Sequence, residues 1–130
     1  MSDKKSTTTG KIGWIDLTVP DAEKIKEFYS AVADWQPTPV NMGSYDDYTM
    51  TTINGEAVAG ICHNSGPNAV LPSQWLVYIN VEDLDVSLKK CKEMGGEIIA
   101  GPFTMESYGR YCVFKDPAGA VAALFEPVSP

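Results

Sequence analysis

Two stretches of this 130-residue chain share one pattern at an offset of 62 positions: WIDLTVPD at residues 14–21 and LVYINVED at residues 76–83. Each alternates apolar and polar side chains, as a half-buried strand does, and each ends in an aspartate suited to cap a helix. Val19 falls over Val81, and Asp21 falls over Asp83. A repeat of about 60 residues is too long for a solenoid unit, so we interpret it as a duplicated supersecondary module.

The residues after each stretch predict the same order of elements twice. In the first module we expect a strand at 11–19, a helix at 22–33 and strands at 36–40, 45–53 and 56–63. In the second we expect a strand at 74–81, a helix at 84–94 and strands at 97–100, 110–114 and 120–125. The fold class is therefore α+β, with two βαβββ modules.

Local signals set the boundaries of these modules. Asn54-Gly55 is a strong hairpin turn that falls over Asp116-Pro117, and Gly101-Pro102 is expected to end a strand. The first helix should bury one apolar face, formed by Ala22, Ile25, Phe28, Tyr29 and Val32. We expect one domain at 11–130, with modules 11–63 and 74–127 joined by a linker at 64–73, after a disordered tail at 1–10.

Composition excludes several classes of partner. The net charge of −7 argues against nucleic acid and against an anionic membrane surface, because both require a basic face. There is no apolar run of about 18 residues, so no transmembrane helix is expected. The first ten residues lack the apolar stretch of a signal peptide. We therefore expect a cytoplasmic protein in which Cys62, Cys91 and Cys112 are reduced thiols, the last two as core residues.

Three features resemble the vicinal oxygen chelate superfamily, which includes glyoxalase I, extradiol dioxygenases and bleomycin-resistance proteins. These are the two modules of this length, a V-x-D before each helix, and Asp116-Pro117-Ala118-Gly119 before the last strand. The resemblance covers residues 11–127, and segments 13–17, 75–81 and 109–120 are similar to a glyoxalase-like subgroup of mostly unknown activity. It implies the glyoxalase/bleomycin resistance/dihydroxybiphenyl dioxygenase-like fold, a cleft between modules, and a homodimer with twofold symmetry.

The same resemblance implies where a divalent metal ion would bind. A histidine in the first strand of each module and a glutamate after the DPxG turn are typical ligands of the superfamily. This chain has Trp14, Leu76 and Ala123 at those positions. A fourth ligand position falls within 56–63 and is not placed more closely. Because a catalytic metal site needs about three protein ligands, we expect no bound metal and no cofactor.

Side-chain alternation predicts which residues line the cleft. Ile15, Leu17 and Val19 should face the helix, so Trp14 and Asp16 should face the other way. The predicted pocket floor has these seven members: Trp14, Asp16, Leu76, Tyr78, Asn80, Ala123 and Phe125. Its apolar and aromatic character, with a few polar groups, is typical of a small-molecule site, and we expect an aromatic or cationic ligand.

For each candidate residue a purely structural role is an alternative to a functional one. For Trp14 the alternatives are stacking on a ligand and filling the space of a lost metal. For Asp16 they are a general base, a partner for a cation, and a carboxylate satisfied by a neighbouring side chain. Tyr78 and Asn80 orient a ligand or are cross-strand partners. His63 is read as a surface histidine. Arg110 is read as an ion-pair partner of a carboxylate such as Asp16 or Glu106.

Four classes of function follow from these readings. The leading hypothesis is a protein of the glyoxalase/bleomycin-resistance kind that binds a small molecule without a metal. The alternatives are a metal-independent enzyme that transfers a proton through Asp16 or Tyr78, a metal-dependent lyase or dioxygenase whose ligands lie at other positions, and a structural protein.

Overall fold

The computed structural model describes residues 8–128, except for the side chains of Pro67 and Asn68. The chain divides into two compact units. The first unit is Trp14–Trp75, and the second is Leu76–Pro130 together with Met1–Gly13. Residues 1–7 of the expected disordered tail lie outside the described part. Thr8–Gly10 form a turn, and the N–H of Gly10 donates to the carbonyl of Asn80 at 2.7 Å.

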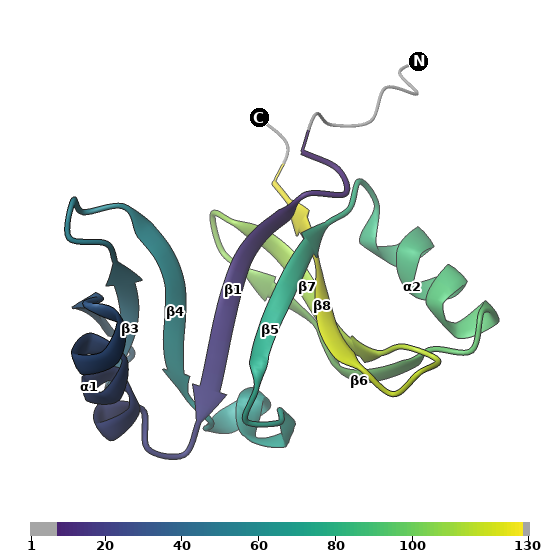
Figure 1. Ribbon diagram of the computed structural model, residues 1–130. Coiled ribbons are helices and arrows are strands. Elements are labelled where there is room, and N and C mark those ends of the chain that lie inside the picture. Colours follow the sequence, from purple (N-terminus) through teal and green to yellow (C-terminus); the bar gives the residue numbers. More distant parts are fainter. Residues whose placement is uncertain (1–7, 129–130) are drawn as a thin grey trace. The chain divides into compact units, whose positions relative to one another are not determined.

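The first unit has the predicted order of strand, helix and three strands (Figure 1). Its elements are β1 (Ile12–Val19), α1 (Ala22–Ala33), β2 (Gln36–Asn41), β3 (Asp46–Thr51), β4 (Ala57–His63) and the short 3₁₀ helix η1 (Gly66–Val70). The sheet order is β2-β3-β4-β1, with β1 and β4 parallel. Asp21 starts α1 as predicted, because its side chain accepts a hydrogen bond from the N–H of Lys24 at 3.1 Å.

The second unit repeats this order. Its elements are β5 (Trp75–Asn80), α2 (Leu84–Glu93), β6 (Glu97–Met105), β7 (Gly109–Lys115) and β8 (Val121–Pro127). The sheet order is β5-β8-β7-β6, with β5 and β8 parallel. Asp83 caps α2 through the N–H of Val86 at 3.2 Å, which is the bond that Asp21 makes 62 residues earlier. The α+β class with two βαβββ modules is therefore confirmed.

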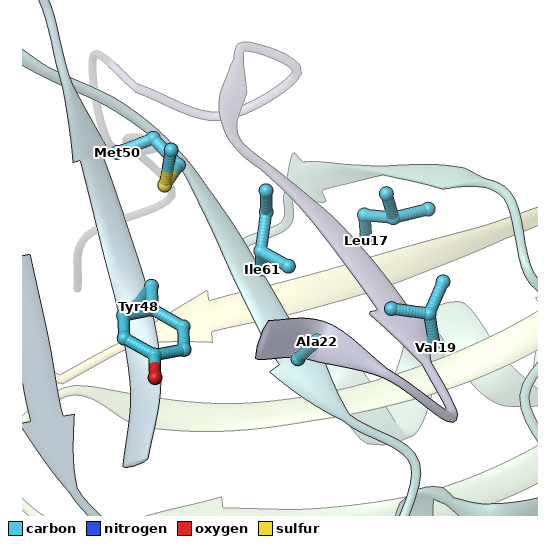
Figure 2. Close-up of a cluster of buried hydrophobic side chains, with 6 residues drawn as sticks. All are labelled: Leu17, Val19, Ala22, Tyr48, Met50 and Ile61. Carbon is cyan, nitrogen blue, oxygen red and sulfur yellow. The ribbon is translucent and has the colours of Figure 1, made fainter. Parts of the chain in front are cut away.

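Each helix covers a small apolar core on one face of its own sheet. In the first unit the buried side chains are Leu17, Val19, Ala22, Tyr48, Met50 and Ile61 (Figure 2). In the second they are Leu84, Leu88 and Cys112, with Val81, Ile98 and Leu124 packed against them. Full burial of one such large apolar side chain contributes about 1.5–3 kcal/mol. The predicted helix-facing side of β1 is confirmed for Leu17 and Val19.

The predicted apolar face of α1 was too wide. Ala22 is buried, and Ile25 and Tyr29 pack on the core, but Phe28 and Val32 are 54% and 63% exposed. The residues of this face that reach the core are therefore Ala22, Ile25 and Tyr29. Within residues 8–128 no helix is long and apolar enough to cross a membrane.

Two local expectations in the strands were also wrong. Gly101-Pro102 does not end β6, because the strand runs on to Met105 and the pairing with β7 shifts register between Ala100 and Phe103. This bulge accommodates the proline, which has no N–H for the ladder. The hairpin turns also align differently: Gly55 corresponds to Gly119, and each N–H donates to the carbonyl three residues earlier, on Thr52 and Asp116. The repeat offset is therefore 62 at the helix caps and 64 at these turns.

Candidate functional site

Trp14 and Asp16 lie on the face of β1 that points away from α1. The indole Nε1–H of Trp14 donates to Asp16 Oδ1 at 2.6 Å, and both side chains are half-buried. Hydrogen bonds to a charged acceptor are shorter and about twice as strong as neutral ones. The bond fixes the orientation of both the carboxylate and the indole ring. The indole N–H of Trp14 is thus one neighbour that satisfies the carboxylate of Asp16.

Gly60 provides the space for this pair. Gly60 lies opposite Asp16 in the parallel ladder of β1 and β4. A Cβ at position 60 would overlap Asp16 Oδ1 and would stand 3.4 Å from Trp14 Nε1. The carboxylate therefore lies across the strand where any other residue would have its side chain. Sequence reasoning missed Gly60, although a glycine inside a predicted strand is a recognised sign of close approach.

Cys62 follows on the same strand and has its thiol close to two carboxylates. Burial raises the pKa of this thiol far above its ordinary value, and the charges of Asp16 and Asp47 and a hydrogen bond to Asp47 raise it further. The thiolate is the nucleophilic form of cysteine. Cys62 is therefore a protonated, unreactive thiol, and this face carries no cysteine nucleophile at position 62.

His63 was expected at the surface, and this expectation was wrong. Its side chain is 19% exposed, and Nδ1 lies 3.3 Å from Oδ1 of Asp47, whose side chain is 13% exposed. The rings of Tyr45 and His63 pack edge to face, with their centroids 4.8 Å apart. The antiparallel pairing of β3 and β4 brings Asp47 next to His63 across 16 residues of sequence. The register of the β3–β4 hairpin was the sequence signal from which the pair of Asp47 and His63 could have been predicted.

The other five predicted floor residues belong to the second unit. Tyr78 pairs with Ala123, and Asn80 pairs with Phe125, in the ladder of β5 and β8. The ring of Tyr78 lies 5.9 Å from that of Tyr111, which in turn lies 5.3 Å from Phe103. These residues share the face opposite α2, with Leu76, Tyr78 and Ala123 buried. Because Trp14 and Asp16 belong to the first unit, a single seven-residue floor stays a prediction.

Arg110 is an ion-pair partner, but not of the carboxylates expected. Its guanidinium donates to Glu126 at 3.1 Å and to Asp85 at 3.3 Å. Glu126 also accepts from the N–H of Leu84 at 2.8 Å, at the start of α2. These contacts raise the pKa of Arg110, first through the hydrogen bond to Glu126. Arg110 therefore anchors a helix start rather than the face that carries Asp16.

The side chains at the three typical metal-ligand positions do not fit a metal ion. Trp14 offers an N–H donor that is already bonded to Asp16, and Leu76 and Ala123 have no donor atoms. Across the part of the chain that the structure describes, no group of three or more His, Cys, Asp or Glu side chains could hold a metal.

Comparison with known proteins identifies relatives for nearly the whole chain. Residues 11–124 match the model of the Glyoxalase/Bleomycin resistance protein/Dioxygenase superfamily. The chain is 32% identical over 131 residues to a Mycobacterium bovis protein, CFP32, whose name proposes a glyoxylase; the match covers 97% of this chain and 49% of that protein. It is 31% identical over 128 residues to the anthracycline biosynthesis protein DnrV of Streptomyces peucetius. This match covers 89% of this chain and 46% of that protein.

The chain thus spans about half the length of these curated relatives. Among solved structures, methylmalonyl-CoA epimerase from Mycobacterium tuberculosis superposes with a TM-score of 0.60 at 13% identity, covering 98% of this chain and 95% of that one. This likeness is one of fold.

Proposed function

Because the chain belongs to the Glyoxalase/Bleomycin resistance protein/Dioxygenase superfamily, we propose that it binds a small aromatic cation through Trp14 and Asp16, without a metal. The observation that carries the proposal is the 2.6 Å hydrogen bond from Trp14 Nε1 to Asp16 Oδ1. It places an oriented carboxylate beside an oriented indole. A site of this kind has its geometry set before the ligand arrives, so little ordering entropy is lost on binding.

The chemistry of the two side chains selects the ligand class. An indole ring attracts a cation or stacks on an aromatic ring, and a carboxylate pairs with a cation. The protonated Cys62 thiol adds no charge beside Asp16. The side chains at positions 14, 76 and 123 supply no metal ligand, which supports recognition by these organic groups alone.

The relatives suggest a probe that has both features. DnrV is named for anthracycline biosynthesis. An anthracycline joins a planar aromatic ring system to an amino sugar that is protonated at neutral pH. We therefore choose an anthracycline as the test ligand for Trp14 and Asp16.

Calorimetric titration with an anthracycline tests the proposal. The wild type should bind it, and Asp16→Asn should weaken binding about tenfold, since about 1.4 kcal/mol of charge pairing is lost. Glu56→Gln is the matched control, because Glu56 is an exposed carboxylate in the β3–β4 turn of the same unit. Equal affinity of wild type and Asp16→Asn, or no binding by the wild type, would refute the proposal.

Proton transfer by Asp16 is the second candidate function. The hydrogen bond from Trp14 holds the carboxylate in one orientation, which is a requirement for a general base. The name of CFP32 suggests the hemithioacetal of methylglyoxal and glutathione as a carbon-acid probe. If Asp16 is the base, turnover with a chelator present should fall about 100-fold or more in Asp16→Asn. Turnover that survives the substitution would exclude this role.

A further inference from the structure

A pocket lies in the first unit, where β4 ends and β3 begins. Its volume is about 400 Å³, and Trp14 and Asp16 are not among its lining residues. The residues that line it are Glu23 of α1, Asn41 at the end of β2, Gly43, Ser44, Tyr45, Asp46, Tyr48 and His63. The volume falls in the range of about 300–1,000 Å³ that is typical of small-molecule sites.

His63 lines this pocket, and Asp47 determines which nitrogen of its neutral ring carries the proton. Asp47 Oδ1 accepts the backbone N–H of His63 at 2.9 Å and lies 3.3 Å from Nδ1. An ionised carboxylate can only accept, so we assign the proton of the neutral ring to Nδ1, which makes Nε2 the acceptor. Tyr45 holds the ring from another side, and its hydroxyl lies 2.7 Å from Ser65 Oγ. The imidazole is thus a fixed acceptor for a ligand that donates a proton.

The other lining groups favour a positively charged ligand. Glu23 and Asp46 bring two carboxylates to the pocket, and Tyr45 and Tyr48 bring two aromatic rings. The ring of Tyr48 is buried and already has the ammonium of Lys26 5.0 Å from its centroid, so the half-buried Tyr45 is the ring open to a ligand. An anionic ligand would meet the two carboxylates. A metal ion would need three suitable side chains together, and none of the described residues form such a group.

We propose that this pocket is a second ligand site, which binds a small organic molecule carrying a primary ammonium group. The ammonium donates one N–H to His63 Nε2 and pairs with Glu23 and Asp46, while the carbon chain of the ligand packs on the ring of Tyr45. A primary ammonium fits better than a quaternary one, because only the primary group has protons for the histidine acceptor.

Nuclear magnetic resonance of His63 tests the site directly, because His63 is the only histidine of the chain. Phenethylamine is the probe, titrated at constant pH up to about 10 mM, above the millimolar affinity of a weak specific site. The imidazole signals should shift and saturate. The trimethylammonium analogue of the probe should bind at least about fivefold more weakly, since one hydrogen bond is worth about 1 kcal/mol. No saturable shift with phenethylamine, or equal affinity for both compounds, overturns the proposal.

Conservative variants locate the ammonium group. The double variant Glu23→Gln, Asp46→Asn should weaken phenethylamine at least about fivefold, as expected for lost charge pairs. Glu56→Gln keeps the pocket intact and should bind as the wild type does. In Asp16→Asn the His63 signals should shift and saturate as in the wild type, because Asp16 does not line this pocket. Normal binding by the double variant, or loss of the His63 response in Asp16→Asn, would contradict the assignment.

Discussion

Gly60 and Asp16 are partners in the parallel ladder of β1 and β4, and the carboxylate of Asp16 occupies the space that a side chain at position 60 would need. The same carboxylate accepts the indole proton of Trp14. Gly60 on one strand therefore leaves the space in which Asp16 and Trp14 on the next strand form their hydrogen bond. This arrangement is the structural basis of the proposed site.

The first prediction concerns this fit. Gly60→Ala should lower the free energy of unfolding by about 1–3 kcal/mol, because the added methyl group collides with Asp16 Oδ1. In an Asp16→Ala background the same change should lower the free energy of unfolding by much less, since the atom that the methyl group meets is gone. Urea denaturation of the four proteins in this cycle measures the coupling. Equal costs in both backgrounds would mean that Asp16 does not lie over Gly60.

The second prediction uses the raised pKa of Cys62. The thiol stays protonated in the folded protein but ionises in the unfolded chain above its ordinary pKa of about 8.5. The unfolded state then binds fewer protons, so stability should fall as pH rises above that value, by up to about 1.4 kcal/mol per pH unit. Cys62→Ala should lose this contribution. Denaturation between about pH 7.5 and 10 tests it, and identical pH slopes for the two proteins would refute it.

The third prediction concerns metal content. Protein purified without added metal should contain no stoichiometric zinc, iron, nickel or manganese, because Trp14, Leu76 and Ala123 offer no ligands. Elemental analysis by mass spectrometry measures this, with a sample soaked in each metal and then desalted as the control. One bound transition metal per chain would show that ligands at other positions hold it.

The fourth prediction is self-association. We expect a homodimer with twofold symmetry, the arrangement that the family resemblance implies and the commonest closed assembly of soluble proteins. Sedimentation at micromolar concentration should give twice the mass of one chain. A monomeric mass at that concentration would contradict the prediction.

The sequence predicted the architecture well because local signals and the repeat agreed. Asp21 and Asp83 marked both helix starts, and strand alternation placed Leu17 and Val19 under α1. It predicted poorly where packing area decides the outcome. Phe28 and Val32 have the spacing of a buried face but remain exposed, whereas Ile25 and Tyr29 of the same face pack on the core.

The candidate site was predicted only in part, for a related reason. Alternation correctly put Trp14 and Asp16 on one face, but it could not show that they bond to each other. The pairs of Gly60 with Asp16 and of Asp47 with His63 depend on which strands are neighbours and in what register. That register follows from the turn and from a bulge between Met50 and Thr51. Single-strand patterns do not contain this information.

Tryptophan fluorescence during an anthracycline titration tests the central claim most directly. Trp14 belongs to the proposed site, whereas Trp35 and Trp75 pack against each other, with ring centroids 5.7 Å apart, beside Tyr29 of α1. Trp14→Phe should therefore lose most of the quenching and bind the ligand about tenfold more weakly. Trp75→Phe should keep both the quenching and the affinity, and it controls for the light that the ligand itself absorbs. Equal quenching and affinity in Trp14→Phe and the wild type would show that the ligand does not bind at Trp14 and Asp16.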